Sequence, residues 1–195
     1  MADQLRWPQR VIDKKELHIG YGNTFPAGGW MMPLTAAVAY LNGYLKGKKI
    51  GLKFIILDDP TNAHVVLEPD STRPGLHGQA HLATTSIQKV EYLYKITIKI
   101  PAKPRISNTD PKARVVGDEI KKCILVHELI HGLGLDNSRH TAEDVFAEGF
   151  QLLPGKTGAD DKMQRDASGP KLPPVLISDI TVGKIREVWN AVADP

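Results

Sequence analysis

The residues best suited to chemistry lie in one short segment: His127, Glu128 and His131, which form the pattern H-E-x-x-H. Residues four apart lie on one face of an α-helix, so both imidazoles can bind one Zn²⁺ ion. Glu128 lies about 100° further around the helix, where its carboxylate can reach a water on the metal without being a ligand. Because zinc lowers the pKa of bound water towards about 7, Glu128 can act as its general base.

The flanking residues indicate that this helix is buried. Residues 123–126 are apolar, and so are Leu129 and Ile130. A helix that is apolar nearly all round is a buried one, and two histidines and a glutamate there are costly unless a partner satisfies them. We expect the helix to run from about residue 118 to 133 and to turn sharply at Gly134. The alternative is a core helix with two satisfied histidines and no metal.

The segment from residue 127 to 138 resembles the metzincin zinc proteases, whose pattern is H-E-x-x-H-x-x-G-x-x-H. The first two histidines, the glutamate and the glycine are in place, and the sequence of the segment is most similar to the matrixin branch. The third-histidine position holds Asn137, and the next histidine is His140. The resemblance implies a zinc-dependent endopeptidase with Glu128 as its catalytic residue and one catalytic zinc ion as cofactor.

The third metal ligand is predicted to be His140. Imidazole binds zinc strongly, whereas the neutral amide of Asn137 binds it weakly. After Gly134 the chain is no longer held to helical geometry, so a wider loop can return to the metal. Asn137 and Glu143 remain alternatives. The residues around Glu143 resemble a segment of peptidases related to the ImmA/IrrE group, in which a glutamate completes the site.

The metzincin resemblance also implies a substrate-binding edge strand, in the place occupied by Gly78, Gln79, Ala80 and His81. Some matrixins hold a structural zinc near this strand, which draws attention to His77 and His81. Residues four apart on a strand lie about 13 Å apart, which is too far for one ion without an intervening turn. We therefore expect only the catalytic zinc.

Two further positions bear on the resemblance. The methionine that lies beneath the zinc in metzincins has no clear equivalent, because Phe146 stands in its expected place and Met163 is the only later methionine. Cys123, one turn before His127, is either an extra thiol near the metal or, as we expect, a small buried core residue. The specificity pocket of the family corresponds to residues 141–175, which show no interpretable pattern.

Several elements must position these residues, and their order resembles the matrixin catalytic domain. The expected fold is α+β and zincin-like: a twisted mixed β-sheet with two main helices and a C-terminal helix. Alternation and helical spacing predict strands at residues 17–21, 50–57, 63–67, 75–84 and 90–100, and helices at 33–47, 118–133 and from Ser178 onward. In the strand at 90–100, isoleucines alternate with lysine and threonine, as in a sheet with one wet face.

Length and composition limit the number of domains and the kinds of partner that the protein can have. The 195 residues suit a single domain, 1–195, in which 1–15 are expected as a surface lead-in and 154–175 as a mobile loop. A net charge of +3 is too small to indicate nucleic acid. No apolar run approaches the roughly 20 residues that span a membrane. No signal peptide is visible, so either the protein is cytoplasmic, or it is exported by a non-classical route, or the sequence has been trimmed. One cysteine allows no intramolecular disulfide.

We expect a monomer whose partner is a peptide or protein substrate. The alternative function is a non-catalytic zinc-binding or protein-binding module derived from a metalloprotease fold. Asn137 favours this alternative, since an amide is a poor zinc ligand. The retained Glu128 favours the enzyme, because a module that only binds has no need of the base.

Overall fold

The computed structural model describes residues 6–72, 75–76, 78–107, 109–110, 112–135, 151–164 and 177–189. The helices in these ranges are α1 (Gln9–Lys14), α2 (Thr24–Ala27), α3 (Met31–Gly47), α4 (Asp118–Gly132) and α5 (Asp179–Val188), with 3-10 turns η1 (Pro60–Asn62) and η2 (Gly158–Asp160). The strands are β1 (Glu16–Tyr21), β2 (Lys53–Ile56), β3 (Val65–Asp70), β4 (Gln79–Ile87), β5 (Val90–Pro101), β6 (Gln151–Leu153) and β7 (Lys162–Gln164).

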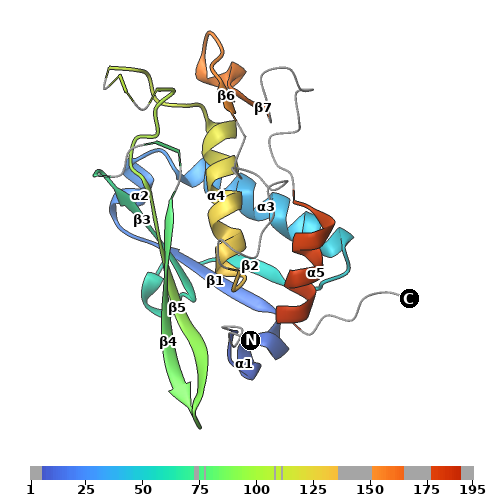
Figure 1. Cartoon of the computed structure of the whole chain (residues 1–195). Helices are drawn as coiled ribbons and strands as arrows, with labels where there is room; N and C mark the ends of the chain where they lie inside the picture. The colour runs from blue at the N-terminus through green and yellow to red at the C-terminus, as the bar shows by residue number, and fades with distance from the viewer. Residues whose placement is uncertain are drawn as a thin grey trace.

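The main sheet is mixed and has the strand order β2-β1-β3-β5-β4 (Figure 1). The first four strands in this order are parallel to their neighbours, and β4 is antiparallel to β5. Strand β4 therefore forms one edge of the described sheet. This arrangement of helices and a mixed sheet agrees with the expected α+β class.

The residue pattern of β5 explains its place next to the edge. Ile96, Ile98 and Ile100 are fully buried against the helices, while the residues between them are partly exposed, as their alternation predicts. At the tip of the β4–β5 hairpin, Gln88 and Lys89 both have positive φ angles, 51° and 67°, as two-residue hairpin turns that follow the strand twist require. The edge strand begins later than expected, at Gln79, and continues to Ile87.

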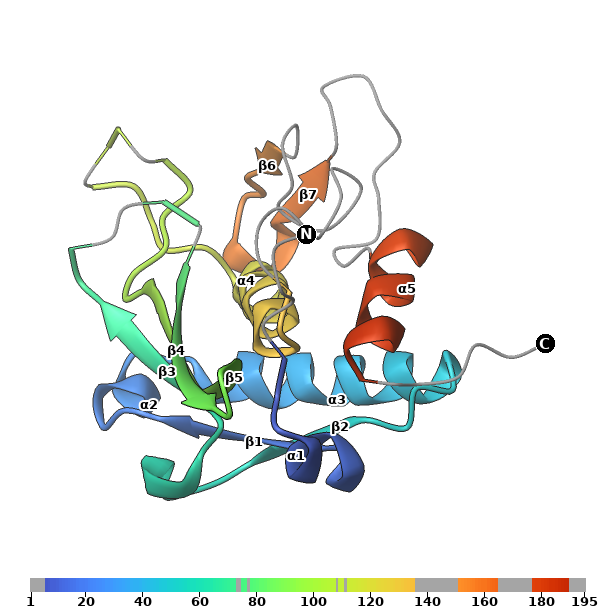
Figure 2. The same ribbon diagram turned by 60° about the horizontal axis from the view of Figure 1, so that its bottom comes forward.

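Helices α3 and α4 lie over the same face of the sheet, with α5 beside them (Figure 2). Helix α3 buries Leu34, Leu41 and Leu45, the apolar positions that its helical spacing predicts. Helix α4 is buried along nearly its whole length, because its apolar residues surround it. Ser178 caps α5 by accepting a hydrogen bond from the Thr181 N–H, as expected. Among the described helices, none is long and apolar enough to cross a membrane.

Part of the segment expected as a surface lead-in, residues 1–15, also contributes to the core. Trp7 is fully buried, and Val11 and Ile12 of α1 are buried with it. The Arg6 carbonyl accepts a hydrogen bond from the Leu93 N–H of β5. A large indole and two branched side chains are enough for this mixed segment to cover an edge of the core.

The segment expected as a mobile loop, 154–175, is not loop throughout. Residues 158–160 form η2, and 162–164 form β7, which pairs with β6 in a small antiparallel hairpin. The frequent glycines, aspartates and lysines of this stretch hid the short strand, because polar strands of three residues carry no alternation signal. The hairpin lies at the N-terminal end of α4 (Figure 1).

Candidate active site

The beginning of α4 is held by a buried ion pair. Asp161, whose side chain is fully buried, binds the Arg114 guanidinium with oxygen–nitrogen distances of 2.5 and 2.8 Å. Its carboxylate also accepts the N–H of Gly117, the residue before the helix, at 2.9 Å. Burial acts to raise the pKa of Asp161, but hydrogen bonds from Arg114, Gly117 and Gly155 outweigh it and lower that pKa. Asp161 is thus a structural anion that keeps the helix start in place.

The end of α4 is held by two tryptophans from distant parts of the chain. The last carbonyls of a helix have no partner within it. The Trp7 indole N–H donates to the Gly132 carbonyl at 3.1 Å, and the Trp189 indole N–H donates to the Leu133 carbonyl at 3.0 Å. Gly134 then turns the chain with φ of +94°, as its position in the motif predicts. Both indoles fix the turn that carries His131.

The structure brings His127, Glu128 and His131 together on the buried side of this helix. They are 8%, 1% and 5% exposed, and the two imidazole centroids lie 5.2 Å apart. The His131 Nδ1–H donates to the Leu135 carbonyl at 2.7 Å. That bond assigns the tautomer in which Nε2 carries the lone pair, which is how histidine ligands are held in metal sites. The pair therefore fits a zinc ion.

Glu128 is held by the edge of the sheet. The Gly78 N–H, directly before β4, donates to Glu128 Oε1 at 2.8 Å. A Cβ atom at position 78 would lie 2.6 Å from Glu128 Cδ and 2.8 Å from the Lys99 carbonyl oxygen. Only glycine allows the strand to approach the carboxylate this closely. The contact fixes the carboxylate at the point where the edge strand meets the helix.

The residues predicted to bind substrate lie along this edge. Gly78 precedes β4, while Gln79, Ala80 and His81 begin it and pair with Lys99, Ile98 and Thr97 of β5. Gln79 and His81 are exposed and Ala80 is partly buried. Within the described sheet, no strand pairs with the other side of β4. An edge strand of this kind is the element to which an extended peptide can add by β-augmentation.

Other predicted positions lie outside the described residues. These are His77, Asn137, His140, Glu143 and Phe146, and Met163 of β7 is described only in its backbone. In the described ranges, no set of three or more His, Cys, Asp or Glu side chains is arranged to hold a metal. Those ranges include two of the predicted ligands, His127 and His131, and the predicted third lies beyond them. The choice among His140, Asn137 and Glu143 stays a prediction.

Cys123 is a core residue, as expected. It is fully buried in the apolar cluster between the helices and the sheet. Burial raises the pKa of its thiol to about 12, so it remains protonated at neutral pH. A protonated thiol is a poor zinc ligand, since metals bind the thiolate.

Several supporting residues have no motif that would reveal them in the sequence. Asp161 and Trp7 support α4 from outside the H-E-x-x-H segment. The contact between Gly78 and Glu128 joins residues 50 positions apart. No protein-family model and no curated protein matches the chain.

Proposed function

We propose that this protein is a zinc-dependent endopeptidase that hydrolyses peptide bonds with Glu128 as general base. One observation carries the proposal: the helix α4, which carries His127 and His131, and the start of the edge strand meet at Glu128. His131 is held by its Nδ1 bond to Leu135, and Glu128 is held by the Gly78 N–H. The mixed sheet, the two helices on one face and the antiparallel edge strand support our further proposal of a zincin fold of the metzincin type.

His127, His131 and, as third ligand, His140 would hold the metal. A bound zinc ion supplies a Lewis acid for the peptide carbonyl and lowers the pKa of water towards about 7. The imidazoles of the two helical histidines are nearly buried. Their burial excludes competing solvent, and the Leu135 carbonyl makes the His131 ring a stronger donor towards a cation.

Substrate binding, proton transfer and positioning of the base are assigned to different residues of the chain. The outer edge of β4 binds the substrate backbone in extended form, so that its peptide group lies beside the carboxylate. Glu128 accepts a proton from the attacking water and later delivers it to the leaving amine. The Gly78 N–H keeps the carboxylate in one orientation throughout, which reduces the reorganisation needed at the reacting atoms.

The direct test is a metal analysis followed by a digest. Protein purified without chelator and dialysed with zinc is expected to contain one tightly bound zinc per chain. It is expected to cleave casein or members of a peptide library, and a chelator should remove both metal and activity. Zinc without cleavage would favour the non-catalytic binding module, and absence of zinc would favour a plain core helix.

The ligand assignment is tested by zinc affinity in His140→Ala, Asn137→Ala and Glu143→Ala. Loss of an imidazole ligand is expected to weaken zinc binding at least tenfold, about 1.4 kcal/mol. The other two variants should bind zinc nearly as the parent does, because an amide oxygen is a weak ligand and one carboxylate is not needed once three imidazoles bind. Parent-like affinity in His140→Ala would reject His140, and the variant that does lose affinity would identify the ligand.

A further inference from the structure

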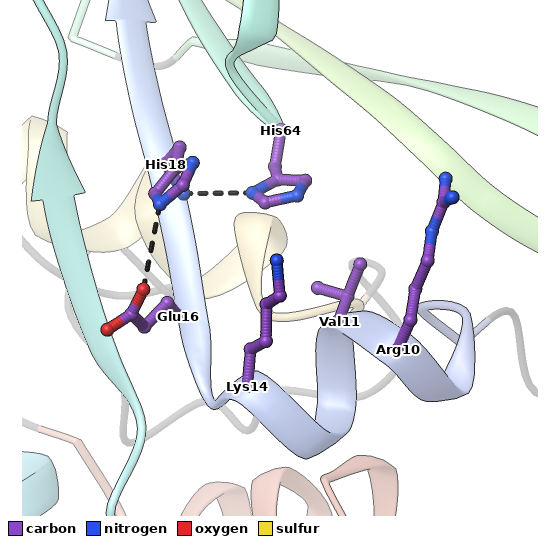
Figure 3. Close-up of a pocket in the computed structure, with 6 residues that line it drawn as sticks. All are labelled: Arg10, Val11, Lys14, Glu16, His18 and His64. Carbon is purple, nitrogen blue, oxygen red and sulfur yellow. Dashed lines mark hydrogen bonds and ion pairs between the residues drawn. The ribbon is translucent and has the colours of Figure 1, made fainter.

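A second candidate binding site lies where α1 meets β1, on elements other than those that hold Glu128. It is a cavity of about 250 Å³. The residues that line it are Arg10, Val11, Lys14, Glu16, His18 and His64 (Figure 3). Its lining includes four side chains that can carry charge or donate a hydrogen bond to an anion, Arg10, Lys14, His18 and His64, beside the apolar surface of Val11.

The two histidines of the lining, His18 and His64, are held together by hydrogen bonds from their backbone N–H groups. The His18 backbone N–H donates to His64 Nδ1 at 3.0 Å, and the His64 backbone N–H donates to the His18 carbonyl at 2.9 Å. Because Nδ1 accepts, the neutral His64 ring carries its proton on Nε2. Burial lowers the pKa of His64, and the nearby His18, Lys14 and Arg10 lower it further. His64 is therefore a neutral ring with a fixed N–H donor.

The cavity also has an excess of positive charge. Arg10 and Lys14 lie one helical turn apart on α1 and face the same way, as Figure 3 shows. Neither forms an ion pair with any residue in the described part of the chain. The one acidic residue of the lining, Glu16, is bound by Lys53 at 2.8 Å. Two cations beside the imidazoles disfavour a metal ion and favour an anion.

We propose that this cavity binds a phosphate group, either as the free ion or as the phosphate of a small monoester. Arg10 and Lys14 neutralise its charge, and His64 Nε2–H donates to one of its oxygens. The donors come from two different elements, α1 and the segment before β3, so they reach the cavity from two sides (Figure 3). A tetrahedral oxyanion accepts from such a set more fully than a planar carboxylate does. Val11 provides an apolar wall beside it.

The site also contacts a residue that supports α4. The Trp7 ring meets the His64 ring edge-on, with centroids 5.6 Å apart and an interplanar angle of 71°. The indole N–H of Trp7 binds the Gly132 carbonyl at the end of the helix. Because His64 lines the cavity, the chemical shifts of its ring nitrogens report on ligand binding there. Phosphate that binds at a metal site elsewhere in the protein does not change these chemical shifts directly.

The test is a titration of the whole protein with inorganic phosphate, followed at the His64 imidazole nitrogens. We expect saturable shifts with a Kd on the order of 1 mM. The double variant Arg10→Gln/Lys14→Gln should bind at least about tenfold more weakly, because it loses two charge-assisted contacts. Both side chains are exposed, so the fold should persist. Lys14→Arg keeps the charge and should keep binding.

Lys15→Gln is the matched control. It removes the same charge from the next residue, but the Lys15 side chain lies against Gly51 rather than in the cavity, so binding should stay close to that of the parent. A parallel titration with glycerol 3-phosphate identifies the source: tighter binding than phosphate indicates a monoester, and equal or weaker binding indicates the free ion. The proposal is overturned by absence of saturable shifts, by equal loss in Lys15→Gln, or by a second zinc equivalent that depends on His18 and His64.

Discussion

Glu128→Gln is expected to reduce peptide hydrolysis by about 10²–10⁴-fold while zinc binding stays at the parent level. Glutamine has nearly the same shape and keeps an oxygen that can accept the Gly78 N–H, so the local structure should persist. It cannot accept the proton of the attacking water at neutral pH. The loss should therefore fall mainly on kcat rather than on KM.

The measurement is steady-state cleavage of a peptide substrate together with zinc content in the same preparation. Glu119→Gln provides the control, because Glu119 is an exposed residue of the same helix that pairs with Lys122 on the surface. It should cleave as the parent does. Parent-like turnover in Glu128→Gln would remove Glu128 from the mechanism, and loss of zinc in that variant would make it a ligand instead.

Gly78→Ala is expected to lower kcat by about 10²-fold, the size of effect that a misplacement of about 1 Å produces. The added methyl would lie 2.6 Å from Glu128 Cδ and 2.8 Å from the Lys99 carbonyl oxygen, closer than van der Waals contact allows. Either the carboxylate or the edge strand has to move. Zinc should stay bound, because the atoms nearest to the added methyl belong to Glu128 and Lys99 rather than to a helical histidine.

Gly43→Ala is the matched control, since a Cβ there meets no atom within 4 Å. Position 43 lies inside α3, where alanine is more favourable than glycine by about 1 kcal/mol, so this variant should be active and slightly more stable. The two variants are compared by kcat, zinc content and thermal unfolding. Full activity in Gly78→Ala would show that the contact with Glu128 has no part in positioning the base.

Much of the framework could be predicted from the sequence because it depends on local pattern. The alternation of Ile96, Ile98 and Ile100 predicts a strand with one buried face, and the apolar surroundings of His127 and His131 predict a buried helix. Both are confirmed. The Ser178 cap is confirmed for the same reason: its signal lies within four residues of the chain.

The supporting contacts could not be predicted, because they depend on residues distant in sequence. Nothing in the residues near Asp161 indicates that its carboxylate accepts from Gly117, and nothing near Trp7 indicates a contact with Gly132. The cavity at His18 and His64 likewise forms only when β1 and the segment before β3 are adjacent. Single side chains of this kind follow from tertiary packing and carry no periodicity.

The two indoles at the end of α4 have a consequence for how the protein comes into being on the ribosome. Trp7 reaches Gly132 across 125 positions, and Trp189 reaches Leu133 across 56. The turn after His131 is therefore incomplete until residue 189 has left the exit tunnel. The nascent polypeptide therefore contains His127, Glu128 and His131 before the contact of Trp189 that holds the end of their helix can form.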